Sequence, residues 1–250
     1  MTTELVLVRH GESLGNAAAA AAHAQGAEVV DVPARDADVD LSPLGEAQAR
    51  ALGTWLARLP EHERPATVWS SPYVRAHRTA LLALRSADLD LRVRLDERLR
   101  DRELGVLDTL TARGVDARQP FEAARRRWLG KFYYRPPGGE SWADVALRLR
   151  SFLADLERVA EAASTSPGPV MVVCHDAPIM VLRYVCEELT ESEVLAAGRE
   201  RSVRNTSVTR LTREGGPGTA WTLRDFDLAD HLHELAVPAT APPGTADGTA

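Results

Sequence analysis

The sequence predicts an α/β fold of three layers, in which a mainly parallel sheet lies between two layers of helices. Two short apolar runs, Leu5–Val8 and Pro169–Cys174, have the length and the β-branched content of buried parallel strands. Between them, apolar residues recur at helical spacing, so that strands and helices alternate along the chain. Such alternation is typical of parallel sheets, whose strands are joined by crossover helices.

The first quarter of the chain contains two helices and an irregular segment. After the first strand, the alanine-rich run Ala17–Ala24 favours a helix by propensity. The acidic stretch Gly26–Asp40 then indicates a surface insertion near the mouth of a site. Ser42 and Pro43 predict the start of the next helix, because serine caps free amides and proline suits the first helical position. Pro60 predicts its end.

The middle of the chain continues the alternation. Ala66–Trp69 is a second short apolar strand, and Ser71 with Pro72 marks another helix start. The run Leu91–Leu95 alternates apolar residues with arginines, as a half-exposed strand does. Residues 106–140 are then interpreted as an inserted helical cap. An amphipathic helix comes next, because Trp142, Val145, Leu149, Phe152, Leu156 and Val159 share one face.

The last part of the chain is predicted to be two helices, a hairpin and a tail. The expected ranges are Pro178–Glu188 and Ser192–Gly198 for the helices, Ser207–Thr212 and Thr219–Phe226 for the strands. We therefore expect residues 1–235 to form a single domain. Residues 236–250 are rich in alanine, proline, glycine and threonine and lack apolar anchors, which predicts a disordered tail.

Composition limits the classes of partner. The 36 acidic and 30 basic residues give a net charge of −6, which argues against nucleic acid or an anionic membrane surface as the main partner. No apolar run reaches the roughly 18 residues that a membrane span needs, so a cytoplasmic location is predicted. Cys174 and Cys186 fall in predicted buried elements without metal-ligand spacing, which indicates unreactive core thiols.

The candidate site begins directly after the first strand. Arg9-His10-Gly11-Glu12-Ser13, with Asn16 three residues on, joins a planar cation suited to phosphate oxygens to an imidazole that is nucleophilic when neutral. A parallel strand delivers the next residues of the chain to the carboxyl edge of the sheet, where open α/β folds bind ligands. His175 stands at the equivalent place after the later strand, so we expect the two imidazoles to meet there.

These residues resemble the signature of the histidine phosphatase superfamily, the phosphoglycerate-mutase-like proteins. The resemblance recurs in the expected order over residues 4–230. It implies that Arg75, in Ser-x-x-x-Arg-Ala-x-x-Thr-Ala, is a second phosphate-binding arginine and that His175 is the second catalytic histidine. The family's proton-donating acid lies four residues before a glycine, which selects Asp101 before Gly105.

The resemblance also implies a mechanism without metal or cofactor. His10 would attack phosphorus and carry it as phosphohistidine, and water would then release it. Arg9, Arg75, Asn16 and, if protonated, His175 would hold the phosphoryl oxygens, while Asp101 would move the protons. The expected activity is hydrolysis of a small phosphorylated metabolite.

Several alternatives stay open. Glu103, two residues after Asp101, is the one plausible substitute for the acid, because alternate residues of an extended segment share a face. Arg126 and Arg127 belong to a basic run, Arg125–Arg127, that is either a solvated face or a clamp for a substrate anion. The clamp would favour a phosphoglycerate mutase, whereas Leu104, where mutases have tyrosine, counts against one. A non-catalytic, phosphate-dependent binding protein is the other alternative, and a homodimer is also open.

Overall fold

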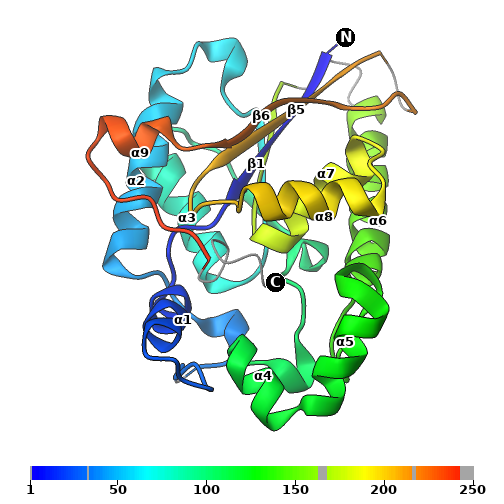
Figure 1. Ribbon diagram of the computed structural model, residues 1–250. Coiled ribbons are helices and arrows are strands. Elements are labelled where there is room, and N and C mark those ends of the chain that lie inside the picture. Colours follow the sequence, from blue (N-terminus) through cyan, green and yellow to red (C-terminus); the bar gives the residue numbers. More distant parts are fainter. Residues whose placement is uncertain (1, 33, 163–167, 216–217, 243–250) are drawn as a thin grey trace.

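The fold is built on a mixed sheet of six strands. The structure, a computed structural model, describes residues 2–32, 34–162, 168–215 and 218–242 (Figure 1). The strand order is β3-β2-β4-β1-β5-β6. The first four of these strands run parallel to one another, and β5 runs antiparallel to both of its neighbours, β1 and β6. The strands are β1 (Thr2–Arg9), β2 (Thr67–Ser70), β3 (Val93–Leu95), β4 (Val170–Cys174), β5 (Val208–Glu214) and β6 (Thr222–Leu228). The predicted α/β class, mainly parallel sheet and edge hairpin are confirmed.

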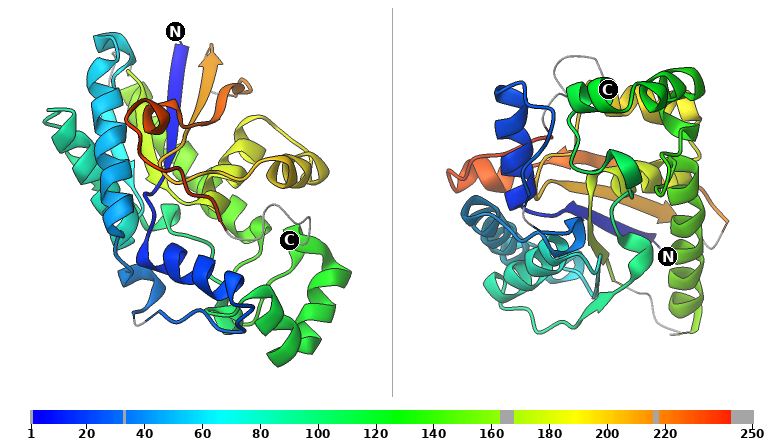
Figure 2. Two further views of the ribbon diagram at one scale, coloured as in Figure 1. Left: turned by 60° about the vertical axis from the view of Figure 1, so that its left-hand side comes forward. Right: turned by 90° about the horizontal axis from the view of Figure 1, so that it is seen from below.

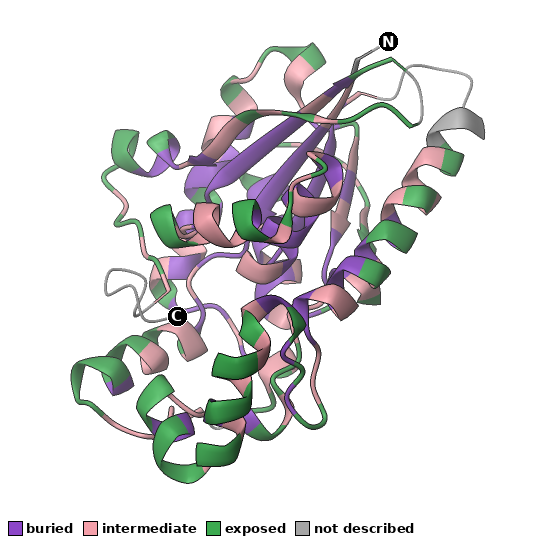
Figure 3. Ribbon diagram, turned by 45° about the vertical axis from the view of Figure 1, so that its right-hand side comes forward, coloured by how far each residue is buried: buried purple, intermediate pink, exposed green. Residues whose placement is uncertain are grey.

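Helices cover both faces of the sheet, which gives the three predicted layers (Figure 2). Side chains alternate along β1, so that Leu5 and Leu7 join one apolar core while Val6 and Val8 join the other. The helices on the first face are α6 (Trp142–Ala162), α7 (Asp176–Cys186) and α8 (Glu191–Glu200). Those on the second face are α2 (Pro43–Arg58) and α3 (Val74–Ser86). Figure 3 shows the strands as the most buried part of the molecule.

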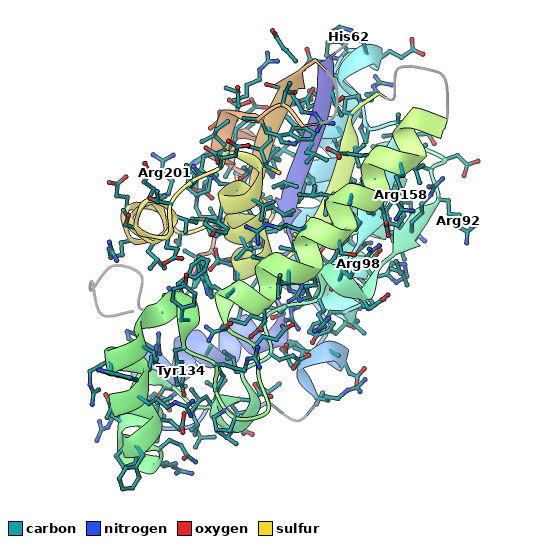
Figure 4. All side chains as sticks on the ribbon, turned by 90° about the vertical axis from the view of Figure 1, so that its right-hand side faces the viewer. His62, Arg92, Arg98, Tyr134, Arg158 and Arg201 are labelled. Carbon is teal, nitrogen blue, oxygen red and sulfur yellow. The ribbon has the colours of Figure 1, made fainter. Side chains whose placement is uncertain are left out.

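The inserted region lies beyond the carboxyl ends of the parallel strands, at the opposite end of β1 from the N-terminus (Figure 1). It consists of α1 (Leu14–Ala24), α4 (Ala112–Arg118), α5 (Pro120–Tyr133) and the short 3₁₀ turns Asp36–Asp38, Glu97–Leu99 and Gly105–Leu107. Residues 106–140, predicted as the cap, have a small core of their own: Leu107, Val115, Ala123 and Tyr134. Figure 4 labels Tyr134 at the end of α5.

The acidic insertion 26–40 is joined to the cap by main-chain hydrogen bonds. The amide of Val30 donates to the carbonyl of Thr109 at 2.8 Å, and the amide of Thr111 donates to the carbonyl of Glu28 at 3.1 Å. The carboxylate of Glu28 also accepts a hydrogen bond from Arg118 at 2.9 Å. The two inserted segments therefore lie together at the mouth of the site, as the sequence predicted for the first of them.

The chain end partly differs from the expected disordered tail. After the short helix α9 (Asp230–Glu234), residues 236–242 lie back against the fold. Gln48 on α2 donates through Nε2 to the carbonyl of Pro238 at 2.8 Å and to the hydroxyl of Thr240 at 3.0 Å. The amide of Asn205 donates to the carbonyl of Thr240 at 2.9 Å. Polar contacts thus hold this segment, and Val237 is an apolar anchor that the sequence did not suggest, since it packs on Ala51, Ala229 and Leu232. Residues 243–250 lie outside the described part of the chain.

The turn after β1 packs directly on the start of α2. A Cβ atom on Gly45 would lie 1.9 Å from the carbonyl oxygen of Glu12, so only glycine allows this approach. Ser42 caps α2, as predicted, by accepting the amide of Gly45 at 3.0 Å. Its hydroxyl also donates to the carboxylate of Glu12 at 2.7 Å. The helix start therefore fixes the path of the chain next to His10.

Candidate active site

Four parallel strands deliver side chains to one edge of the sheet. His10 follows β1, Arg75 lies in the first turn of α3 after β2, Asp101 follows β3 by six residues, and His175 follows β4. The amide of His10 donates to the carbonyl of Cys174 at 3.0 Å, which extends the pairing of β1 and β4. The two imidazole ring centres are 5.0 Å apart. The structure thus brings the two predicted histidines together.

The hydrogen bonds of His10 fix its tautomer. Nδ1 is 2.7 Å from the carbonyl oxygen of Gly11, which can only accept, so the imidazole proton lies on Nδ1. Nε2 therefore carries the free lone pair and accepts from Nε of Arg75 at 3.3 Å. Burial, and next the charges of Arg75, His175 and Arg9, hold the pKa of His10 well below its ordinary value. The imidazole is therefore neutral and nucleophilic near neutral pH.

The second histidine faces the same space with its other nitrogen. Nε2 of His175 is 2.9 Å from the hydroxyl of Ser71, which already accepts the amide of Tyr73 at 3.2 Å. The Ser71 hydroxyl can thus donate to Nε2, which places the imidazole proton on Nδ1. Nδ1 makes no hydrogen bond within the described structure and lies 3.4 Å from Asp101 Oδ2. Burial, and next Arg75 and Arg9, also hold the pKa of His175 well below its ordinary value.

Arg9 presents a second unpaired buried donor. Its Nη1 donates to the carbonyl of Val203 at 2.7 Å, whereas its Nε has no hydrogen-bond partner among the described residues. Buried polar groups are almost always paired, so an unpaired one needs an explanation. Nε of Arg9 and Nδ1 of His175 are two such donors at one edge, and an anion such as a phosphoryl group would satisfy both.

Asp101 and Glu103 have different surroundings. Asp101 Oδ2 lies 3.3 Å from Nη2 of Arg75, whereas Glu103 accepts a hydrogen bond from the hydroxyl of Tyr73 at 2.7 Å. Arg148 on α6, whose side chain is mostly buried, donates to the main-chain oxygen of Asp101 at 3.1 Å. Gly105, four residues after Asp101, has φ of +54°, and a Cβ atom on it would lie 2.1 Å from the carbonyl oxygen of Pro137, so this position requires glycine. The geometry thus brings Asp101, and not Glu103, to the histidines.

Asn16 is held next to the site by hydrogen bonds with Ser13, the residue that caps the start of α1. Its Oδ1 accepts the amide of Ser13 at 3.1 Å, and the amide of Asn16 donates to the hydroxyl of Ser13 at 3.0 Å. Asn205, which the sequence did not suggest, donates to the main-chain oxygen of His10 at 2.8 Å and lies 3.4 Å from Asn16 Oδ1. Only its position after α8 and before β5, near the edge, could have indicated it.

Two adjoining cavities open from this edge. One, of about 290 Å³, contains His10, Arg9, Arg75, Asn16 and Asp101 together with an aliphatic wall formed by Ala19, Val30, Val32, Val39, Leu104 and Leu110. The other, of about 330 Å³, adds Arg102, Glu103, Lys131 and Trp142. The residues that line both cavities are Arg9, Asp36, Asp101, Leu104, Asp108 and Asp176.

The cations at the second cavity are not the predicted ones. Arg127 is exposed and pairs with Asp116 at 3.1 Å, and neither Arg127 nor Arg126 lines either cavity. Arg102 instead points inward, since its Nε donates to the carbonyl of Glu140 at 2.7 Å. Burial, opposed by the nearby Asp176, is the main cause that lowers the pKa of Lys131. The helix α5 turns Arg125 and Arg127 outward and presents Lys131 to the cavity. Arg126 is half-buried, and after burial its charge is the next cause that lowers the pKa of Arg102.

The remaining candidate groups have other surroundings. Asp176 begins α7 and lines both cavities, and burial raises the pKa of its carboxyl group although Arg9 opposes that. Cys174 and Cys186 are free, buried thiols whose pKa burial raises to about 12. Within the described ranges, no cluster of three or more His, Cys, Asp or Glu side chains could hold a metal ion, and no helix could cross a membrane. The cytoplasmic location and the homodimer stay predictions.

Fold and site together define a three-layer α/β protein with two histidines and two arginines at the carboxyl edge of its sheet. Residues 5–225 match the model of the histidine phosphatase superfamily, branch 1. The chain belongs to this family, as its resemblance predicted.

Proteins with similar sequences include phosphatases and a mutase. The chain is 33% identical to the glucosyl-3-phosphoglycerate phosphatase of Mycobacterium tuberculosis over 86% of this chain and 87% of that protein. It is 32% identical to the 2,3-bisphosphoglycerate-dependent phosphoglycerate mutase 2 of Gloeobacter violaceus, over 76% and 78%. The solved native structure of a mycobacterial glucosyl-3-phosphoglycerate phosphatase superposes with a TM-score of 0.73 at 29% identity, over 91% of this chain and 100% of that one.

The surroundings of His10 lead to a prediction about its protonation. In the folded protein the His10 imidazole should bind a proton only well below pH 6.5, the ordinary value. Arg75→Gln removes a neighbouring cation and should raise this pKa. Arg78 donates to Glu46 at 2.7 Å and not to His10, so Arg78→Gln should leave the pKa of His10 unchanged. NMR titration of the ring protons of His10 in the three proteins measures the effect.

The lowered pKa of His10 also makes the free energy of unfolding depend on pH. Below pH 6.5 the unfolded chain binds a proton at this position and the folded protein does not, so the free energy of unfolding must fall as the pH falls. A His10 that titrates at or above pH 6.5 would contradict the burial of this ring and the positive charge around it.

Proposed function

We propose that the protein is a metal-independent phosphatase that hydrolyses a small phosphorylated metabolite through a phosphohistidine on His10. The observation that carries this proposal is the arrangement around Nε2 of His10. A neutral imidazole with its lone pair on Nε2 lies beside the Arg75 guanidinium. Two buried donors without partners among the described residues, Nε of Arg9 and Nδ1 of His175, lie at the same edge.

The first step forms a bond between Nε2 of His10 and phosphorus while the ester bond to the leaving oxygen breaks. Arg9, Arg75 and His175 donate to the phosphoryl oxygens, and fixed donors stabilise the transition state at no reorganisation cost. Asp101, next to both Arg75 and His175, gives its proton to the leaving oxygen, so the product departs as a neutral alcohol.

The second step returns the enzyme to its starting state. Asp101, now a carboxylate, removes a proton from water as the water oxygen attacks phosphorus. The bond to Nε2 of His10 breaks, and inorganic phosphate is released. Because Nδ1 stays bonded to the carbonyl of Gly11 throughout, His10 leaves as the neutral tautomer that began the cycle.

The substrate that fits the second cavity carries another anionic group. Arg102 and Lys131 line this cavity beside Asp101, on the side where the leaving group must be protonated. A carboxylate or a second phosphate would pair with these cations, because each offers hydrogen-bond donors to an anionic oxygen. The relatives named for glucosyl-3-phosphoglycerate and bisphosphoglycerate support the same class of substrate.

A phosphoglycerate mutase activity is the second candidate, supported by the mutase relative. It requires the phosphoryl group to pass back to the organic product instead of to water. Incubating the purified protein with phosphorylated metabolites, 3-phosphoglycerate included, and scoring both free phosphate and 2-phosphoglycerate separates the two activities. A protein that binds phosphate esters but forms neither product would be the non-catalytic alternative.

The phosphohistidine can be trapped. During turnover with a ³²P-labelled substrate, acid-labile label should appear on the protein and should be absent from His10→Ala. Turnover should continue in the presence of a chelator, because the proposed chemistry uses only protein side chains. Full activity in His10→Ala would exclude the mechanism, and loss of activity with chelator would exclude its independence of metal.

The role of Asp101 can be separated from that of Glu103 by the leaving group. Asp101→Asn should slow hydrolysis of an alkyl phosphate by ~10²-fold or more. An aryl phosphate with an acidic phenol should lose much less, because its leaving group departs without a proton. Glu103→Gln is the matched control and should affect both substrates alike. If only Glu103→Gln shows the leaving-group dependence, then Glu103 is the acid.

The second anionic group can be tested at Lys131. Lys131→Met should raise KM for 3-phosphoglycerate by ~10-fold relative to KM for a phosphate ester without a second charge, since one charge-assisted contact is lost. Arg127→Met, an exposed cation on the same helix, is the control and should change neither value. A selective effect of Arg127→Met, with none of Lys131→Met, would instead support the clamp predicted from the sequence.

A further inference from the structure

The Arg75 guanidinium already has an anionic partner. Its Nη1 donates to the main-chain oxygen of Asp36 at 2.6 Å and to Oδ1 at 3.0 Å, and its Nη2 donates to Oδ2 at 3.1 Å. The two carboxylate oxygens of Asp36 thus bind the two terminal nitrogens in the forked geometry typical of arginine with a carboxylate. Asp36 lies in the acidic insertion, and nothing in the sequence pattern indicated this contact.

A phosphoryl group bound at His10 needs the same two nitrogens of Arg75, Nη1 and Nη2, that Asp36 occupies. The third nitrogen of Arg75, Nε, is committed to Nε2 of His10 at 3.3 Å, which is the atom that would attack phosphorus. Only Nη1 and Nη2 are left to bind phosphoryl oxygens next to that atom. Carboxylate and phosphate use the same fork on arginine, so Asp36 and the substrate require the same donors.

We propose that Asp36 is a built-in competitor for the phosphate site and determines how tightly this site binds phosphate. The proposal rests on the phosphatase function proposed above. Before a phosphoryl group can pair with Arg75, the carboxylate of Asp36 must leave the guanidinium. After hydrolysis, the return of Asp36 to Arg75 favours the release of inorganic phosphate.

The surroundings indicate that Asp36 would move and Arg75 would stay. The Arg75 side chain is only 5% exposed and is also held by Asp101, whereas the Asp36 side chain is 47% exposed. Asp36 begins a single 3₁₀ turn, Asp36–Asp38, and this turn contributes no residue to the apolar cores. Moving one exposed carboxylate is a smaller change than moving a buried cation.

Phosphate can displace Asp36 because it has more partners. A phosphoryl group can accept from Arg9 and His175 as well as from Arg75, whereas the carboxylate of Asp36 contacts Arg75. The net binding free energy of inorganic phosphate is the difference between its contacts with Arg9, His175 and Arg75 and the contacts that Asp36 loses. A substrate gains in addition the contacts of its leaving group, but both ligands must displace Asp36 from the same two nitrogens, so Asp36 lowers the affinity for substrate and for inorganic phosphate alike.

The test compares Asp36→Asn with Asp38→Asn. Asparagine keeps the size of the side chain and removes its charge, so both variants lose one negative charge in the same turn. Asp38 pairs with Arg35 on the surface and does not contact Arg75. Binding of inorganic phosphate and of orthovanadate is measured by calorimetry, and inhibition by phosphate is measured during turnover.

Asp36→Asn should tighten phosphate and vanadate binding by ~10-fold or more, the contribution of one pair of charge-assisted hydrogen bonds. KM should fall in parallel, and Asp38→Asn should behave as the wild type. Weaker or unchanged binding in Asp36→Asn would overturn the proposal and would show that Asp36 only positions Arg75. Equal tightening in both variants would also overturn it, because a general change of charge would then explain the effect.

The binding measurements do not depend on turnover, so the two proposals can fail separately. If no phosphate ester is hydrolysed but Asp36→Asn still binds phosphate more tightly, the phosphatase function fails and the competition stands. If hydrolysis through His10 is found but Asp36→Asn shows no tighter binding, the competition fails alone. Thermal unfolding of each variant, with Asp36→Ala as a second substitution, ensures that the comparison concerns folded protein.

Discussion

The rest of the site depends on the contacts of one buried group, the guanidinium of Arg75. It touches the nucleophile His10, the proposed acid Asp101 and the competing carboxylate of Asp36 at once. Burial first, and next the charge of Arg75, lower the pKa of His10 and keep its imidazole neutral and nucleophilic. Burying such a cation is costly unless it is paired, and the two carboxylates provide the pairs. One group therefore both activates the histidine and requires the anions around it.

The parts of the site that the sequence predicted are those that the sheet itself positions. His10 and His175 each follow an apolar strand directly, and parallel pairing of neighbouring strands leaves little freedom in where the next residue lies. Arg75 needed the family resemblance, because an arginine in the first turn of a helix is more often a solvated residue. Asp101 needed the family's spacing, because the segment between β3 and Gly105 has no repeating pattern.

The parts that the sequence missed come from loops and from the rotation of a helix. Asp36 reaches Arg75 through the path of residues 26–40, which is set by hydrogen bonds to the cap and not by local propensity. On α5, the basic run drew attention to Arg127, yet the buried face of that helix presents Ala123 and Phe132 and turns Arg127 to solvent. Lys131 lies beside Phe132 at the kink at Gly130, whose φ of +76° no periodicity predicts.

The charge balance of the site accounts for selectivity without strong phosphate binding. The net charge of −6 leaves no general attraction for anions, so the attraction must come from Arg9, Arg75, Arg102 and Lys131 at the sheet edge. Asp36, Asp101 and Asp176 line the same space and offset much of that charge. A single phosphate therefore gains little by entering, whereas a second anionic group beside Arg102 and Lys131 adds contacts that no carboxylate of the described site already makes. In such a site the organic part of the substrate, more than its phosphate, decides which ester is bound.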